Sequence, residues 1–202
     1  MLEDPMEFLF HDQRAVITQR EMGSDAAEFS DALRSGLRQD PDVIVLGELR
    51  DRETIQIALT AAETGHLVLA TLHTNDAKGS IDRMLDVFPP DGRDQIRVQL
   101  SESLLGVVTQ QLVPRSDRKG RVVATEVLVR SPSVAEAIRQ NILDRIPELI
   151  AKSGDVYSMH TMNQSLAALV RSNVVSREVA LSQSARPEDL ELTLNGISRD
   201  AA

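Results

Sequence analysis

The sequence contains no cysteine and no tryptophan, and only 2% of its 202 residues are aromatic. Without cysteine the chain can form neither a disulfide nor a thiolate metal site, which suits a reducing compartment such as the cytosol. With so few aromatic rings, the core has to be built from aliphatic side chains. Hydrophobic residues make up 42% of the sequence, which is sufficient for such a core.

Long apolar runs are also missing. None approaches the roughly 18 residues that are needed to span a bilayer, and residues 1–5 have neither the basic nor the apolar region of a signal peptide. The net charge is −9 and the isoelectric point is about 4.9. This surplus of acid argues against a nucleic-acid binder, although backbone amides could still hold a phosphate. We therefore expect a soluble cytoplasmic protein with no transmembrane segment and no nucleic-acid partner.

The phosphate-binding loop G-x-x-x-x-G-K-[ST] is absent as well. In that loop, backbone amides and the lysine hold the phosphates of a nucleotide. Lys78 and Lys119 precede glycines, and Lys152 precedes a serine without the required glycines before it. The chain itself therefore offers no such loop.

The stretch that organises the sequence is residues 42–51, Asp-Val-Ile-Val-Leu-Gly-Glu-Leu-Arg-Asp. A continuous apolar run of this length, followed by a helical pattern, is typical of a strand buried on both faces of a parallel sheet. Ligands of open parallel sheets bind beyond the carboxyl ends of the strands. Glu48 is therefore placed where a ligand would lie, and the alternative is that it is only a solvated loop glutamate.

A helix and a second strand follow this stretch. Residues 51–64 have helical periodicity, with Asp51 as the expected N-cap and Gly65 as the expected C-terminal stop. Residues 66–73 then form a second apolar run, bracketed by histidines. Strand, helix and strand with short joints predict a parallel crossover unit.

The preceding residues predict two more strands and a helix. Residues 2–3 read as the end of a strand, and residues 14–19 as a short strand with a β-branched centre. Ser24 or Asp25 is expected to cap a helix that runs to Arg38.

The later part of the chain changes character. Residues 107–113 and 121–129 predict an antiparallel hairpin, and only helical patterns follow Pro132. We therefore expect an α/β core over residues 1–131, a helical C-terminal subdomain over 132–184, and a disordered tail over 185–202.

Polar residues follow three of the predicted strands: Glu3-Asp4, Gly47-Glu48 and His73-Thr74. In a parallel sheet all three pairs would lie on one rim, where carboxylates and a histidine could hold a metal–phosphate group and orient a water. His66 is expected roughly 23 Å from His73, at the opposite end of its strand. The alternatives stay open: a backbone-bonded junction residue for His66, and an ordinary structural contact for His73.

These segments resemble the type II and type IV secretion ATPases. Residues 2–7 resemble the aspartate box of that family, residues 42–51 its Walker B segment and residues 64–74 its histidine box. Residues 32–41 and 100–104 resemble the branch that retracts type IV pili in twitching motility. Ala137-Ile138-Arg139 resembles the start of the retraction motif of that branch, from which residues 140–143 depart.

The resemblance implies a RecA-like parallel sheet with a C-terminal helical appendage, here partial, since the N-terminal strands and the Walker A loop lie upstream in the family. It also implies a homo-hexameric ring that hydrolyses ATP with magnesium and docks on an inner-membrane platform protein of the pilus machine. The protein would thus be cytoplasmic and peripheral at the inner membrane.

The resemblance also assigns roles to site residues. Glu48 would polarise the attacking water, Glu3 would help to position water or metal, and the two carboxylates would hold magnesium. His73 would contact the γ-phosphate, and His66 belongs to the same box. Three further residues would lie at the nucleotide: Gly47, Asp4 and Arg50.

Arg34 and Arg38 could also neutralise phosphate charge, or they could be surface ion-pair partners. Because the phosphate-binding loop is absent, we expect the chain alone to be inactive. Two rival readings stay open. One is a non-catalytic module that only joins a ring, and the other is a type II secretion or pilus-extension ATPase.

Overall fold

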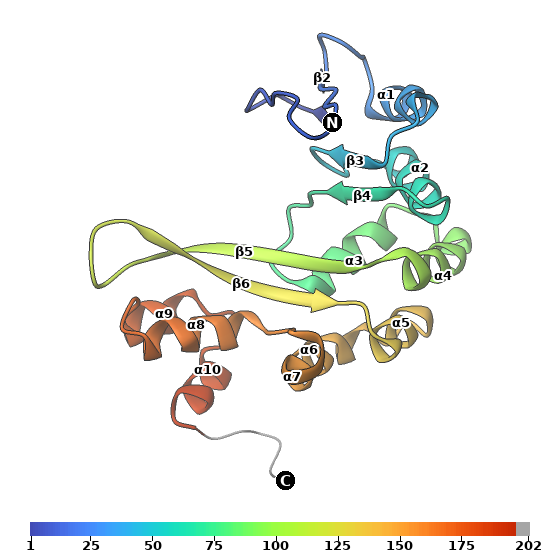
Figure 1. Cartoon of the computed structure of the whole chain (residues 1–202). Helices are drawn as coiled ribbons and strands as arrows, with labels where there is room; N and C mark the ends of the chain where they lie inside the picture. Colours follow the sequence, from blue (N-terminus) through green and yellow to red (C-terminus); the bar gives the residue numbers. More distant parts are fainter. Residues whose placement is uncertain (197–202) are drawn as a thin grey trace. The chain divides into compact units, whose positions relative to one another are not determined.

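The computed structural model describes residues 1–196, and these divide into two compact units (Figure 1). The first unit comprises residues 1–73 and 83–103, and the second comprises residues 74–82 and the chain from residue 104 onward.

The first unit is built on a parallel sheet of four short strands in the order β2-β1-β3-β4. The strands are β1 (Leu2–Glu3), β2 (Arg20–Glu21), β3 (Val43–Leu46) and β4 (Leu67–Ala70). Every pairing in this sheet is parallel. The predicted parallel arrangement is therefore confirmed, and the carboxyl ends of β1, β3 and β4 share one rim.

Helices accompany this sheet. They are α1 (Phe29–Gly36), η1 (Leu37–Gln39), α2 (Arg52–Glu63), the end of α3 (Ala77–Asp86), η2 (Pro90–Gly92) and α4 (Arg93–Ser103). The predicted caps of α2 are confirmed. The Asp51 carboxylate accepts a hydrogen bond from the Thr54 amide at 2.8 Å, and Gly65 follows the helix with a left-handed φ of +100°.

Only one face of strand β3 is buried, so the prediction of burial on both faces is wrong. Ile44 and Leu46 are buried, whereas Val43 on the opposite face is 49% exposed. Val43 pairs with Leu67 of β4, which is 42% exposed, and Leu69 on the same face of β4 is 50% exposed. This bare apolar face is unusual, because the two faces of a parallel sheet are normally both covered.

Two local predictions before this strand are also wrong. Residues 14–19 form no strand, since side chains take up their backbone groups: the Ile17 amide donates to Asp12 Oδ1 at 2.7 Å. Helix α1 begins after Glu28, because the Asp25 carboxylate instead accepts from the Glu21 amide at 2.8 Å and forms a turn.

The second unit combines an antiparallel hairpin with helices. The hairpin consists of β5 (Gly106–Pro114) and β6 (Arg121–Val129), as predicted. The helices that follow are α5 (Pro132–Arg139), η3 (Leu143–Arg145), α6 (Ile146–Lys152), α7 (Gly154–Tyr157), α8 (Met162–Arg171), α9 (Arg177–Gln183) and α10 (Pro187–Leu194). The hairpin thus groups with the helices, whereas the predicted boundary at residue 131 had assigned it to the sheet.

The predicted disordered tail is wrong for residues 187–194, which form helix α10. Its Leu190 is fully buried and belongs to a core cluster with Val113, Ala124 and Leu166 from the hairpin and α8. The last part of that prediction, residues 197–202, lies outside the described residues. The α/β class with a helical C-terminal portion is confirmed.

Candidate active site

The carboxyl rim of the parallel sheet carries the predicted site. Glu3 ends strand β1, Glu48 follows β3, and His73 follows β4. Parallel strands end on the same side of a sheet, so the topology brings these side chains to one edge.

Glu48 lies at the centre of a small charged network. Its Oε2 accepts from Arg50 Nε at 2.5 Å, and its Oε1 lies 3.4 Å from His73 Nε2. Arg50 Nη1 also reaches Asp4 Oδ2 at 3.2 Å. Four of the predicted site residues are therefore brought together, with Arg50 between two carboxylates.

The hydrogen bond from Arg50 lowers the pKa of the Glu48 carboxyl below its ordinary range. Partial desolvation opposes this shift, and the charges of Arg50 and His73 add to it. The Glu48 side chain is 19% exposed, so a water can still approach it. The ionised form of a carboxylate is the one that can accept a proton, and Glu48 presents this form at the carboxyl rim of the sheet.

Gly47 holds the end of strand β3 close to β1. Its amide donates to the Leu2 carbonyl at 2.7 Å, and a Cβ at this position would lie 3.3 Å from both the Leu2 oxygen and Glu3 Cα. The Thr71 hydroxyl donates to the Gly47 carbonyl from the end of β4. A side chain at this position would therefore press on the backbone of β1, which gives Gly47 a structural reason that the sequence did not reveal.

Glu3 forms a different contact from the one expected. Its Oε2 accepts from Gln19 Nε2 at 2.8 Å, and among the described residues its carboxylate takes no part in the charged network around Glu48. Gln19 and Thr71 were both missed by sequence reasoning. Thr71 directly follows β4 on the carboxyl rim, and that position was the available signal. Gln19 directly precedes β2, at the amino end of that strand, where the sequence offered no such signal.

His66 lies at the junction of α2 and β4, at the opposite end of the strand from His73. Its Nδ1 is 3.0 Å from the Ala61 carbonyl, and its amide donates to the same carbonyl at 3.1 Å. These contacts match the backbone-bonded junction alternative and not a position on the rim. Similarly, Arg34 pairs with Glu53 at 2.5 Å, as a surface ion-pair partner would.

Within residues 1–196, no cluster of three or more histidine or acidic side chains could hold a metal ion alone. Magnesium is usually held by one or two carboxylates together with the phosphates of the substrate. The carboxylates of Glu48 and Asp4 are donors of that chemistry, although both are paired with Arg50. The chemistry of these two carboxylates thus suits a magnesium ion that is bound together with phosphates.

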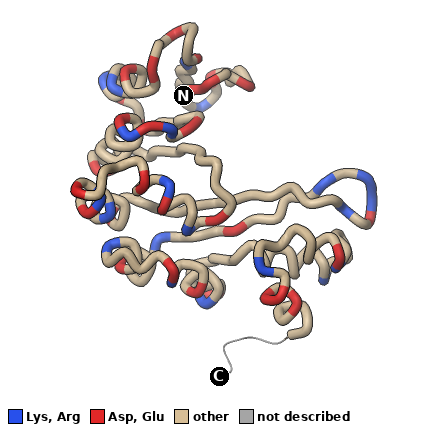
Figure 2. Tube along the Cα trace, turned by 180° about the vertical axis from the view of Figure 1, so that it is seen from behind, with Lys and Arg blue, Asp and Glu red and all other residues tan. Residues whose placement is uncertain are grey.

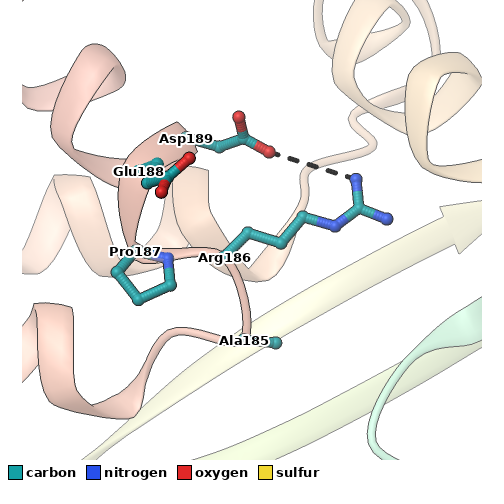
Figure 3. A pocket seen from close by; sticks show the side chains of 5 residues that line it. All are labelled: Ala185, Arg186, Pro187, Glu188 and Asp189. Carbon is teal, nitrogen blue, oxygen red and sulfur yellow. Dashed lines mark ion pairs between the residues drawn. The ribbon is translucent and has the colours of Figure 1, made fainter.

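A surface hollow of about 560 Å³ lies elsewhere, in the second unit. Five consecutive residues line it, Ala185 to Asp189, and Arg186 reaches Asp189 across it at 4.0 Å (Figure 3). None of the predicted site residues takes part. Chemistry at the strand ends, and not the size of a hollow, therefore identifies the candidate site.

Charge is distributed unevenly over the chain. Figure 2 shows cationic residues at the tip of the β5–β6 hairpin, where Arg115 is bound by Asp117 at 2.6 Å and 2.8 Å.

Across the described residues, no helix is long and apolar enough to span a membrane.

Comparison with known proteins gives the following similarities. Residues 1–200 match the family described as Type II/IV secretion system protein. The chain is 44% identical over 189 residues to a twitching motility protein of Neisseria gonorrhoeae, covering 94% of the chain and 50% of the relative. It is 43% identical over 188 residues to the type IV pilus retraction ATPase PilT of Pseudomonas aeruginosa, covering 93% and 54%.

A solved structure agrees with these relatives. The crystal structure of the pilus retraction motor PilT with bound ADP superposes with a TM-score of 0.85 at 43% identity, covering 94% of this chain and 53% of that one. The chain thus spans about half the length of the relatives that it matches.

Proposed function

The chain belongs to the Type II/IV secretion system protein family, and we propose that it is the water-activating part of a motor that hydrolyses ATP to retract type IV pili. In this proposal Glu48 is the catalytic base, and His73 contacts the terminal phosphate. Arg50 with Asp4 sets the charge around the base, and Glu3 helps to position water or metal. The similarity to twitching-motility proteins over more than nine-tenths of the chain supports the retraction branch.

The observation that carries the proposal is the placement of Glu48. An ionised carboxylate stands at the carboxyl rim of a parallel sheet, 3.4 Å from a histidine that is itself 83% exposed. Such a carboxylate can accept the proton of an attacking water, while the exposed histidine can reach a ligand above the rim. Magnesium bound with ATP would neutralise charge on the phosphates.

While Arg50 is bound to Glu48, the site is in an inactive state. While Arg50 Nε holds Glu48 Oε2 at 2.5 Å, one lone-pair direction of the base is occupied. A phosphate group near the rim would offer Arg50 a more highly charged partner than a carboxylate. Arg50 is therefore expected to turn from Glu48 to the nucleotide and to free the base.

The site needs a phosphate-holding partner for turnover. Phosphoryl transfer depends on positioning and electrostatics around the triphosphate, and the loop that would supply them is not in this sequence. The bare apolar face of β3 and β4, with Val43, Leu67 and Leu69, supports the same view. Such a face is normally covered by further polypeptide.

The test compares the 202-residue chain with a chimera in which the preceding half of the Pseudomonas relative is joined to it. The chimera is expected to release phosphate from ATP in a magnesium-dependent reaction, and the chain alone is not. Glu48→Gln is expected to lower kcat in the chimera by about 100-fold or more, whereas Glu28→Gln is the matched control, since Glu28 is exposed and its side chain makes no capping hydrogen bond to α1. Undiminished turnover in Glu48→Gln would contradict the assignment of the base.

The wider function belongs to the same proposal. We place the working protein in the cytoplasm as a homo-hexamer that docks on an inner-membrane platform protein of the pilus. Deleting the gene is expected to leave pili present while twitching motility is lost. Loss of the pili themselves would instead favour the extension or secretion machine, and normal motility would favour a non-catalytic ring module.

A further inference from the structure

Gln19 connects the rim of the sheet to the loop that precedes β2. Its side-chain Nε2 donates to Glu3 Oε2 and to the Phe8 carbonyl, both at 2.8 Å. Its Oε1 accepts from the Phe10 amide at 2.7 Å. A glutamine side chain offers two N–H donors and one carbonyl acceptor, so each of its polar groups has a partner here.

This arrangement fixes the orientation of the Gln19 amide. If the amide were rotated by 180°, Nε2 would face the Phe10 N–H, and Oε1 would face the Glu3 carboxylate and the Phe8 carbonyl. Each of the three contacts would then place a donor against a donor or an acceptor against an acceptor. The amide therefore has one favourable orientation, and in that orientation it holds one oxygen of Glu3.

The loop on the other side of Gln19 has little regular structure of its own. Residues 4–18 contain no helix or strand, and the side chains of Phe8 and Leu9 are 71% and 76% exposed. Few buried contacts hold such a loop, so its backbone hydrogen bonds decide its conformation. The two bonds to Gln19 tie its middle directly to the residue that also holds Glu3.

We propose that Gln19 is a positioning residue for Glu3, which orients this carboxylate at the rim and couples it to the Phe8–Phe10 loop. One part of this proposal rests on the proposed function: that the coupling keeps Glu3 in place to position water or metal. The coupling itself is a property of the chain as it stands.

The first test needs no catalytic activity. Chymotrypsin cleaves after exposed Phe and Leu, so its rate at Phe8–Phe10 in the 202-residue chain reports how firmly the loop is held. The masses of the products separate cleavage at Phe8–Phe10 from cleavage at the leucine that each variant introduces. Gln19→Leu is expected to raise this rate by about fivefold or more. Gln13→Leu is the matched control, since Gln13 lies in the same loop, is exposed, and makes no side-chain hydrogen bond within residues 1–196.

A double-mutant cycle on the same readout tests the link to Glu3. Glu3→Ala is expected to raise the cleavage rate as well, because Gln19 loses a partner that fixes it, and to add little in the Gln19→Leu background. Cleavage that is unchanged in Glu3→Ala, or fully additive effects, would overturn the coupling. Gln19→Glu, which keeps the acceptor for Phe10 and loses the donor to Glu3, replaces Gln19→Leu if the latter fails to fold.

The second test uses the chimera described above. Gln19→Leu is expected to lower kcat about tenfold and to change KM for ATP by less than about twofold, since Glu3 acts on the reaction and not on nucleotide affinity. In a Glu3→Gln background the same substitution is expected to have no further effect on kcat. A loss that persists in that background would show that Gln19 does not act through Glu3.

The two tests separate the two proposals. If turnover of the chimera does not depend on Glu48, the proposed function fails, and the cleavage cycle still decides on the coupling. If turnover depends on Glu48 while both cycles show no link between Gln19 and Glu3, the function stands and the positioning role is refuted.

Discussion

At the scale of single residues, the charge on Glu48 is governed by its neighbours and not by burial. The hydrogen bond from Arg50 lowers its pKa more than partial desolvation raises it. Glu48 is therefore an ionised group whose basicity is reduced while Arg50 remains bound. A mechanism that uses Glu48 as a base has to include the departure of Arg50.

Replacing Arg50 by glutamine is expected to raise the pKa of Glu48 toward its ordinary range, because the guanidinium that favours the ionised form is gone. With a lowered pKa, the pair stabilises the fold above the ordinary glutamate range and loses this effect as the pH falls through the lowered value. Carbon-detected NMR titration of the Glu48 carboxyl checks the shift. Arg34→Gln, which breaks the pair with Glu53, should leave the Glu48 titration unchanged; an equal titration in Arg50→Gln would contradict the account.

Glu126 is a buried glutamate of the second unit, and its hydrogen bonds explain why a carboxylate is tolerated there. It is only 8% exposed. Its Oε1 accepts from the Ala77 amide at 2.9 Å, and its Oε2 accepts from the Met162 amide at 3.3 Å. These two amides begin helices α3 and α8, so one carboxylate caps two helices whose N-terminal ends favour negative charge.

Glu126→Leu is expected to destabilise the chain by about 3 kcal/mol, because two helix amides lose a charged acceptor in a buried place. Glu126→Gln, which keeps one acceptor, is expected to cost about 1 kcal/mol. Urea denaturation measures both. Thr109 faces Glu126 across the hairpin, and its buried hydroxyl has no hydrogen-bond partner among residues 1–196. Thr109→Val is therefore the control and should be neutral or stabilising. A marginal cost for Glu126→Leu would refute the capping role.

At the scale of elements, β3 and β4 present two unlike faces. Leu46 is fully buried on one face, while Leu69 is 50% exposed on the other. Leu46→Ala is expected to cost about 2–5 kcal/mol, and Leu69→Ala less than about 1 kcal/mol, in the free energy of unfolding of the isolated chain. Chemical denaturation compares them directly. Similar costs would mean that the exposed face is covered in solution.

The elements that the sequence predicted well are those with a complete local signal. Strand β3 follows a proline and ends at a glycine, and α2 has both its cap and its stop, so its predicted limits agree with Arg52–Glu63 to within a residue. The rim also followed from the sequence, since parallel topology alone brings Glu48 and His73 together. Glu48 also pairs with Arg50, which pairs with Asp4, and the roles of Arg50 and Asp4 in nucleotide binding stay predictions.

The remaining errors have physical causes that a local pattern does not contain. Residues 14–19 resemble a strand, but Asp12 and Gln19 satisfy backbone groups of that loop in place of a neighbouring strand. Residues 187–194 resemble a frayed tail in sequence, yet as helix α10 they are held by Leu190 and Leu194 in a core formed with residues distant in the sequence. Burial of β3 on a single face depends on what covers the sheet, which no single strand reveals.

At the scale of the whole molecule, the chain passes between its two units three times, after residues 73, 82 and 103. Helix α3 contributes its first residues to the second unit and its last residues to the first. The second unit nevertheless has a core cluster of its own, which includes Leu166, Ala180 and Leu190. A unit with its own core can open by itself.

Leu190→Ala is therefore expected to destabilise the second unit by about 2–5 kcal/mol while the first unit keeps its stability. Hydrogen exchange reports on the two units separately. Amides of α8 should exchange faster by the factor that corresponds to this loss of stability, and the exchange rates of amides in β3 and α2 should not change. Leu105→Ala is the matched control, because Leu105 belongs to the same unit and is 61% exposed. Equal acceleration in both units would show that the chain unfolds as one cooperative body, and that the helical unit transmits its stability to the sheet that carries Glu48.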